Sequence, residues 1–270
     1  MPRARWERNA EFWIRIIRER LDPYRTGLTD AAVLRALGPC DGKVVLDAGC
    51  GEGYLTRSFA RRDASAFGID QSSGMIAAAS AAAGRAANRS RFLVGDLRAL
   101  PLPAARFDAV VCNHSLNEQR DLKPVFAEFG RVLRPGGVLV VLMLHPCFYG
   151  GRRDESGRRI ELDPDEYFVA RRVEQRFNVS GLLSPAPTVI WVRPLESYFA
   201  LLADAGFCVE RLWEPHPSRR LMGEAWWRDN FRKPLFLLWR AVRRSRAVRQ
   251  PRRSPGRRRS GSLWRRPGLW

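Results

Sequence analysis

Three acidic residues each end a short apolar run of the sequence. Asp47 closes "KVVLDA", Asp70 closes "SAFGID" and Asp96 closes "FLVGD". Carboxylates at strand ends can bind ribose hydroxyls or attract a cationic ligand, and Asp70 follows Asp47 by 23 residues, as a ribose-binding acid would. One such acid could equally be a helix cap or a turn residue. Three at consecutive strand ends favour a ligand site.

A glycine-rich turn follows the first of these acids, with the spacing Gly49-x-Gly51-x-Gly53. Bare backbone between a strand and a helix lets a ligand approach the N–H groups at the helix N-terminus. NAD, FAD and other adenosine ligands share this feature. However, Tyr54 stands where a dinucleotide fingerprint has its third glycine. A pyrophosphate is also disfavoured beside a carboxylate, so Asp47 favours a cationic amino-acid ligand.

Alternating strands and helices from Lys43 onward would bring these residues together. Strands are expected at 43–48, 65–70, 91–96, 107–113 and 138–144, and helices from about 54, at 75–87 and at 122–133. "RPGG" is expected to end the third helix. Two last strands, "FCVERLWE" and "KPLFLLWRAV", follow a helix between Pro194 and Gly206, and the second suits an antiparallel position. The pattern predicts an α/β fold with a doubly wound, mostly parallel sheet, whose strand ends share one edge.

Three segments flank or interrupt this alternation. Residues 1–42 are expected to form a helical N-terminal cap, with Thr29 or Asp30 capping its second helix. Within the main domain, residues 43–242, the polar and glycine-rich segment 145–193 is expected to be a loop-rich lid over the substrate, in which "EYFVARRVEQRFNV" could form a strand. Residues 243–270 consist mainly of Arg, Pro, Ser and Gly, so a disordered tail is expected there.

Composition excludes several classes of protein. The sequence has no apolar run of about 18 residues, and its first 20 residues lack the apolar core of a signal peptide. Five cysteines, an odd number without a CxxC pair, argue against a disulfide framework or a zinc site. We therefore expect a cytoplasmic protein without a metal.

The net charge of +19 lies mainly in the tail. Of the 47 Lys and Arg residues, 14 follow Asn230, where no Asp or Glu occurs. The first 229 residues thus hold 33 basic and 28 acidic residues, a net charge of only +5. The charge therefore does not by itself indicate that the folded part binds nucleic acid.

Five segments in this order resemble the class I S-adenosylmethionine-dependent methyltransferases, over residues 43–240. They are "VLDAGCGEGYLTR", "GIDQSSGMI", "FLVGDLRALPLPAARFDAVVCNHSL", "EFGRVLRPGGVLVVL" and "PLESYFALLADAGF". The resemblance implies a seven-stranded sheet whose last strand is antiparallel, and S-adenosylmethionine as the cofactor.

The resemblance also implies roles for individual residues. The three glycines would lie under the methionine part of the cofactor, Asp47 near its amino group and Asp70 at the ribose, and Asp96 would accept from the adenine amino group. Further residues would adjoin these positions or close over the cofactor: Tyr24, Arg25, Gln71, Met75, Leu97 and Asn113.

Two histidines could assist the chemistry at the sheet edge. Methyl transfer is a one-step displacement that depends chiefly on positioning, and a base helps when the acceptor carries a proton. His145 follows the fifth strand and His114 the fourth. Each could instead hold a loop by a hydrogen bond. Glu118 is a weaker candidate and is expected to be a solvated charge at a helix start.

The sequence lacks motifs that are typical of enzymes acting on nucleic acids. After the fourth strand the sequence reads "CNHS", without the Pro-Pro-aromatic motif of amino-methylating nucleic-acid enzymes, and Cys147 lacks the companion Pro-Cys of the RNA carbon-methylating type. A small-molecule acceptor is therefore favoured, a secondary metabolite or a quinone-like compound. Its pocket wall would include the aromatic residues of the lid segment: Phe148, Tyr149, Tyr167, Phe168, Phe177 and Trp191.

Other functions stay open at this stage. The Arg-rich tail could bind RNA or DNA through phosphates, with Trp264 stacking on bases, or bind an acidic membrane surface. A third alternative is a protein that binds the cofactor without transferring a methyl group. The identity of the acceptor, the atom methylated and the oligomeric state do not follow from the sequence.

Overall fold

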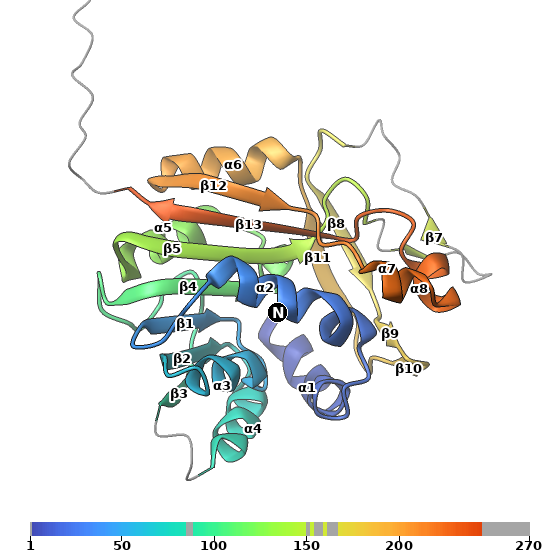
Figure 1. Ribbon diagram of the computed structural model, residues 1–270, viewed down its shortest axis with the longest axis horizontal. Coiled ribbons are helices and arrows are strands. Elements are labelled where there is room, and N and C mark those ends of the chain that lie inside the picture. Colours follow the sequence, from blue (N-terminus) through green and yellow to red (C-terminus); the bar gives the residue numbers. More distant parts are fainter. Residues whose placement is uncertain (1, 85–88, 150–151, 154–158, 161–166, 245–270) are drawn as a thin grey trace, which may run out of the picture.

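A seven-stranded sheet crosses the centre of the molecule, with its strands in the order β12-β13-β5-β4-β1-β2-β3 (Figure 1). The computed structural model describes residues 2–84, 89–149, 152–153, 159–160 and 167–244. The strands of this sheet are β1 (Val44–Ala48), β2 (Ser65–Asp70), β3 (Ser90–Val94), β4 (Phe107–Asn113), β5 (Leu133–Leu144), β12 (Phe207–Trp213) and β13 (Phe236–Arg243).

The strand directions confirm the predicted doubly wound, mostly parallel sheet. β1 pairs in parallel with both β2 and β4, and the other neighbours are also parallel up to β5. β13 runs antiparallel to both β5 and β12, as expected for the last strand. The chain moves outward from β1 to β3 and then returns to β4 on the other side of β1. Ligands of such folds bind at this reversal, outside the carboxyl ends of the strands.

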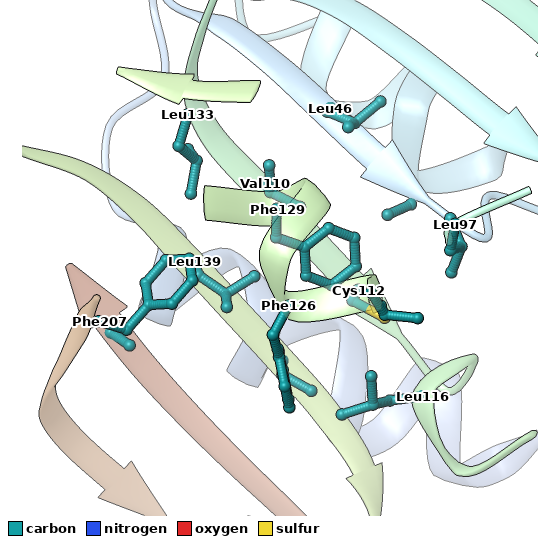
Figure 2. Close-up of a cluster of buried hydrophobic side chains, with 14 of the residues drawn as sticks. Leu46, Leu97, Val110, Cys112, Leu116, Phe126, Phe129, Leu133, Leu139 and Phe207 are labelled. Atoms are coloured by element: carbon teal, nitrogen blue, oxygen red, sulfur yellow. The ribbon is translucent and has the colours of Figure 1, made fainter. Parts of the chain in front are cut away.

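Helices cover both faces of the sheet. They are α1 (Pro2–Arg18), η1 (Arg25–Thr29), α2 (Asp30–Leu37), α3 (Tyr54–Ala60), α4 (Ser73–Ala83), η2 (Leu116–Glu118), α5 (Lys123–Val132), α6 (Leu195–Asp204), α7 (Arg219–Met222) and α8 (Ala225–Asn230). Side chains alternate along β1, so Leu46 packs with α5 and α6 while Val45 packs with α2 and α3. Figure 2 shows the first of these cores, in which Phe126 and Phe129 of α5 lie among residues from the strands.

The N-terminal cap is helical as predicted, but its details differ. The first helix begins at Pro2, and the second continues from the π-helical turn η1 without a break. Thr29 occupies the N-cap position of α2, yet it has helical backbone angles and its side chain forms no capping hydrogen bond. A side-chain cap was expected because the helix appeared to start there. The preceding turn supplies the backbone partners instead.

The "RPGG" segment does not separate helix from strand as expected, because it lies inside β5. Leu133 pairs with Phe107, and the ladder resumes where Val138 pairs with Ala109. The residues between form an irregularity with Gly136 at φ 77°. α5 nevertheless ends at Val132, as the sequence indicated.

The segment 145–193, expected to be loop-rich apart from one strand, contains several strands. β8 (Arg171–Gln175) pairs antiparallel with β11 (Thr188–Val192), and β9 (Asn178–Val179) forms a hairpin with β10 (Leu182–Leu183). A short pair, β6 (Arg152–Arg153) and β7 (Arg159–Ile160), precedes them. We refer to residues 145–193 as the insert.

Buried Asn9 joins α1 to the insert. Its Nδ2 donates to the carbonyl of Ala186 at 3.0 Å, and its Oδ1 accepts from the amide of Ala186 at 2.9 Å. Trp13 of the same helix packs edge-on against Phe177, with ring centroids 5.2 Å apart. The insert and the N-terminal cap therefore form one wall beside the strand ends.

Among the described residues, no helix has the length and apolarity needed to cross a membrane. The tail expected at 243–270 lies outside the described residues, apart from Arg243 and Arg244.

Candidate active site

A cavity of about 660 Å³ lies at the carboxyl ends of β1, β2 and β4, enclosed further by α1, η1, η2 and the insert. Its volume is in the range of small-molecule sites. All of the residues expected around the cofactor line this cavity except Gly53; they are Tyr24, Arg25, Asp47, Gly49, Gly51, Asp70, Gln71, Met75, Asp96, Leu97 and Asn113.

Two glycines of the turn line the cavity, and the third packs against the neighbouring elements. Gly49 (φ 78°) and Gly51 (φ 54°) line the cavity, and a Cβ on Gly51 would meet nothing within 4 Å. Gly53 instead faces α4 and β3, where a Cβ would approach Phe92 to 2.5 Å and Ala79 to 2.9 Å. Gly53 therefore permits close packing of the turn, and it does not form the floor that was expected of it.

Asp47 is almost completely buried at the end of β1. Its Oδ2 accepts a 2.7 Å hydrogen bond from the hydroxyl of Thr56. Burial raises the pKa of Asp47 to about 7, against the hydrogen bonds from Thr56 that lower it. A cationic group bound in the cavity would favour the ionised carboxylate.

Asp70 and Asp96 differ in how firmly they are held. Asp70 accepts from the amides of Ser72 at 2.9 Å and Gly51 at 3.0 Å, and burial raises its pKa. Asp96 forms a 2.6 Å ion pair with Arg98, whose hydrogen bonds lower the pKa of Asp96. Asp96 lines the cavity, but a ligand would share its carboxylate with Arg98.

A hydrogen-bond network centred on Tyr54 was not foreseen from the sequence. The Tyr54 hydroxyl accepts from Arg25 Nη1 at 3.0 Å and Asn113 Nδ2 at 3.2 Å, and donates to Asp30 at 2.9 Å. Asn113 Oδ1 is buried and has no hydrogen-bond partner. In the sequence, the only indication of this network was that Tyr54 replaces the third glycine of the dinucleotide fingerprint. The network leaves one acceptor atom unsatisfied where a ligand would bind.

His114 lies in the cavity in a strained conformation. Its φ is 61°, which is uncommon outside glycine, and its ring packs edge-on against Phe236 with centroids 5.4 Å apart. Burial, and secondarily the charge of Arg25, lower the pKa of His114 well below its ordinary value. His114 is therefore neutral at physiological pH.

His145 lies outside the cavity lining. It is buried, its Nδ1 accepts from the amide of Cys147 at 3.1 Å, and its Nε2 lies 3.0 Å from Glu214. Because Nδ1 accepts, Nε2 carries the proton and donates to Glu214. Both ring nitrogens are thus in use, and the geometry supports the loop-holding alternative rather than contact with a substrate.

Glu118 was expected to be a solvated charge at a helix start. It instead lines the cavity, at the end of η2. Its Oε2 accepts a hydrogen bond from Trp6 Nε1. Burial raises the pKa of Glu118 well above its ordinary value.

The aromatic wall comes only partly from the insert. Of the six aromatic residues proposed for it, Tyr149 and Phe177 line the cavity, whereas Phe168 is 80% exposed. The other aromatic lining side chains come from elements outside the insert: Trp6, Trp13, Tyr24, Tyr54, Trp226 and Phe236. The sequence pattern did not reveal that α1 and α8 reach this site.

No cluster of three or more His, Cys, Asp or Glu side chains suited to a metal ion occurs within the described part of the chain. The fold and the site therefore define a small-molecule cavity at the switch point of an α/β sheet, lined by carboxylates.

Comparison with known proteins agrees with this class. The sequence model described as "Methyltransferase domain" matches residues 46–141. An uncharacterized methyltransferase of Mycobacterium tuberculosis is 34% identical over 121 residues, covering 44% of this chain and 60% of that protein. A demethylmenaquinone methyltransferase of Tropheryma whipplei is 38% identical over 111 residues, covering 41% of this chain and 45% of that protein. The match thus spans less than two thirds of these relatives.

Solved structures extend the likeness beyond that segment. An S-adenosylmethionine-dependent methyltransferase from Mesorhizobium loti has 26% identity and a TM-score of 0.63, over 79% of this chain and 96% of the other. The [4+2]-cyclase SpnF has 20% identity and a TM-score of 0.54, over 79% of each chain, which is a likeness of fold alone. Residues 46–141 are thus similar to the methyltransferase domain family, and most of the chain is similar to a solved S-adenosylmethionine-dependent methyltransferase.

Proposed function

We propose that the chain transfers a methyl group from S-adenosylmethionine to a small-molecule acceptor by in-line displacement. The observation that carries the proposal is the meeting of three groups in one cavity: the carboxylates of Asp47 and Asp70, and the unpartnered Oδ1 of Asn113. When bound, S-adenosylmethionine supplies an electrophilic methyl group on a cationic sulfur.

The residues present fit this donor. Asp47 and Asn113 Oδ1 offer two acceptors for an ammonium group, and the guanidinium of Arg25 offers a cation for a carboxylate. Asp70 keeps free lone pairs on both oxygens, because each accepts only one of the two backbone bonds described above. Gly51 leaves open space beside it. The role of the chain is then to hold the donor, exclude water and align the acceptor.

A small-molecule acceptor, quinone-like or a secondary metabolite, has two supports. The cavity extends past the carboxylates to aromatic side chains such as Tyr149, Phe177 and Trp226, which suit a planar apolar acceptor. One relative is named as a demethylmenaquinone methyltransferase.

Calorimetry with S-adenosylhomocysteine, the spent form of the donor, tests the proposal directly. We expect binding with a Kd in the micromolar range, about −8 kcal/mol, and at least a tenfold loss in N113A. NAD serves as the negative control. No heat with S-adenosylhomocysteine, together with binding of NAD, would contradict the proposal.

Two alternatives have different outcomes. If the chain only binds the cofactor, as a regulator or as a cyclase-like catalyst, S-adenosylhomocysteine binds but no fraction of a metabolite extract acquires label from tritiated S-adenosylmethionine. If the chain modifies RNA or DNA, label enters nucleic acid, and removal of residues 245–270 abolishes it.

A further inference from the structure

Among the described acids that line the cavity, Glu118 is the one that neither the donor site nor an ion pair uses. The acids lining the cavity are Asp22, Asp47, Asp70, Asp96, Glu118 and Glu174. Asp22, Asp96 and Glu174 each form an ion pair with an arginine. Asp47 and Asp70 are assigned to the donor above. Within the described residues, no Lys, Arg or His side chain lies within 4.0 Å of the Glu118 carboxylate.

Hydrogen bonds to the residues on either side of Glu118 in the sequence fix its position. The adjacent Asn117, 1% exposed, accepts from the amide of Leu144 at 3.0 Å and donates to its carbonyl at 3.5 Å. Buried Arg193 donates to the carbonyls of Gln119 at 2.6 Å and Arg120 at 2.7 Å. Glu118 therefore projects into the cavity from a rigid support, as a group that acts on a substrate requires.

The surroundings of Glu118 suit a proton acceptor. Trp6 Nε1 donates to one carboxyl oxygen, and this bond favours the ionised form and orients the group. His114 is the other candidate base in the cavity; its burial lowers its pKa, and no described hydrogen bond orients its ring as Trp6 orients Glu118. A carboxylate without a countercharge in a partly dry site is also unfavourable for an anionic acceptor.

We propose that Glu118 is the general base of the acceptor site, and that the acceptor is an aromatic compound whose nucleophilic atom is a hydroxyl oxygen or an amine nitrogen that carries a proton. This inference rests on the proposed function. The acceptor lone pair forms the bond to the methyl carbon, and the sulfur–carbon bond breaks with its electron pair remaining on sulfur. The proton on the acceptor atom moves to the Glu118 carboxylate, which completes the balance of atoms and charge.

The pH dependence has a definite sign. Burial raises the pKa of Glu118 well above its ordinary value, so its ionised form, which is the base, becomes populated at a higher pH than in an exposed glutamate. Methyl transfer should therefore increase with pH, and this acid limb should disappear in Glu118→Gln. The other charged or titratable groups that share the cavity are retained in that variant: Asp22, Tyr24, Arg25, Asp47, Cys50, Tyr54, Asp70, Asp96, His114, Tyr149, Glu174 and Arg176.

The first test is transfer of label from tritiated S-adenosylmethionine to a mixed panel of phenols, aromatic amines, benzoates and aromatic thiols. We expect label on a phenol or an amine, and at least a 100-fold slower rate in Glu118→Gln. Glu118→Asp should retain intermediate activity. The matched control is Glu196→Gln, because Glu196 is exposed on α6 outside the cavity lining.

A second readout does not depend on turnover. Ligand-observed NMR with protein saturated by S-adenosylhomocysteine compares binding of the same panel to the wild type and to Glu118→Gln. Phenols or amines should bind the wild type at least fivefold more tightly, and benzoates should not bind better than they do to the variant. Thermal unfolding and the Kd for S-adenosylhomocysteine show whether the variant is folded.

The outcomes separate this inference from the proposed function. Label on a benzoate or a thiol, a rate in Glu118→Gln within threefold of the wild type, or equal panel binding by the two proteins overturns the role of Glu118. If no panel compound is labelled, the NMR comparison alone decides the question. If the wild type does not bind S-adenosylhomocysteine, the proposed function is overturned instead.

Discussion

At the scale of single residues, Asp47 links ligand binding to a cost in stability. Its carboxyl is buried with one side-chain hydrogen bond, and burial raises its pKa from 3.8 to about 7. The folded protein thus holds a proton on Asp47 more tightly than the unfolded chain does. Stability contributed by the neutral form is complete below the lower value and is lost as pH rises toward the higher one.

Asp47→Asn should therefore stabilise the protein at pH 8 and have little effect at pH 4. We expect an increase in the free energy of unfolding of roughly 1–4 kcal/mol at pH 8, measured by urea denaturation. The same variant should bind S-adenosylhomocysteine at least tenfold more weakly, because the ammonium group loses its countercharge. If Asp47→Asn destabilised the protein equally at both pH values, burial would not disfavour the ionised carboxylate.

Ligand affinity should follow the same ionisation. Between about pH 5.5 and 7.5, Asp47 becomes charged while an α-amino group stays largely protonated, so the affinity for S-adenosylhomocysteine should rise. Calorimetry across this range should show a rise of roughly tenfold in the wild type and a flatter curve in Asp47→Asn. A flat wild-type curve would remove Asp47 from the binding site.

The two histidines predict opposite phenotypes. His145 bonds to the Cys147 amide and to Glu214, so His145→Ala should lose about 1–3 kcal/mol of unfolding free energy. His145 does not line the cavity, and the Kd for S-adenosylhomocysteine should stay within twofold. His114→Ala is the comparison, since its ring makes no hydrogen bond that the structure describes and faces the cavity. An unchanged stability of His145→Ala with lost ligand binding would reverse the assignment.

At the scale of elements, Asn9 controls how α1 meets the insert. Its two hydrogen bonds to Ala186 are the buried polar link between these elements. Asn9→Leu should leave the amide of Ala186 without a partner, while its carbonyl keeps the 3.3 Å hydrogen bond from the hydroxyl of Ser184, so the expected cost is roughly 1–3 kcal/mol. Hydrogen exchange of the β8–β11 pair should accelerate, because the wall of the cavity loses its anchor. Exchange that accelerates equally in β1 and β4 would indicate global destabilisation only.

Hydrophobic periodicity was sufficient for the strands and helices of the sheet. "VVLDA" and "FDAVVCN" are buried on both faces. Such a continuous apolar run is typical of a central strand in a parallel sheet. The spacing from Asp47 to Asp70 placed two acids on the same edge because both strands are parallel. Local pattern and tertiary structure agree there.

The cavity walls depend on contacts that no local pattern encodes. Trp6 reaches Glu118 across 112 residues of sequence, and Asn9 reaches Ala186 across 177. The sequence shows Trp6 and Glu118 only as members of a charged amphipathic helix and of a polar turn. Tyr54, Glu118 and α8 were missed for this reason. His145 was favoured because its partner, Glu214, lies 69 residues further along the chain and no local pattern pairs the two.

At the scale of the whole molecule, the charge and the fold occupy different parts of the chain. Residues 245–270 carry nine of the arginines and no acid, so their removal lowers the net charge from +19 to +10. The sheet is complete at Arg243, where β13 pairs with Phe207 of β12. A cut after Arg244 is therefore preferable to one after Val242, which would remove the last paired residue of β13.

The chain truncated after Arg244 should fold and bind S-adenosylhomocysteine within twofold of the full-length protein, since none of the residues that line the cavity is removed. Its affinity for double-stranded DNA at low salt should fall by at least tenfold, because each phosphate contact contributes about −0.9 to the slope of log K against log salt. Full-length protein and the truncated form would be compared by fluorescence anisotropy between about 50 and 200 mM salt. A truncation that also abolishes transfer to a small-molecule acceptor would contradict this separation, because it would make the tail part of the active site. Retained transfer together with lost DNA affinity would show that the positive charge serves association and not chemistry.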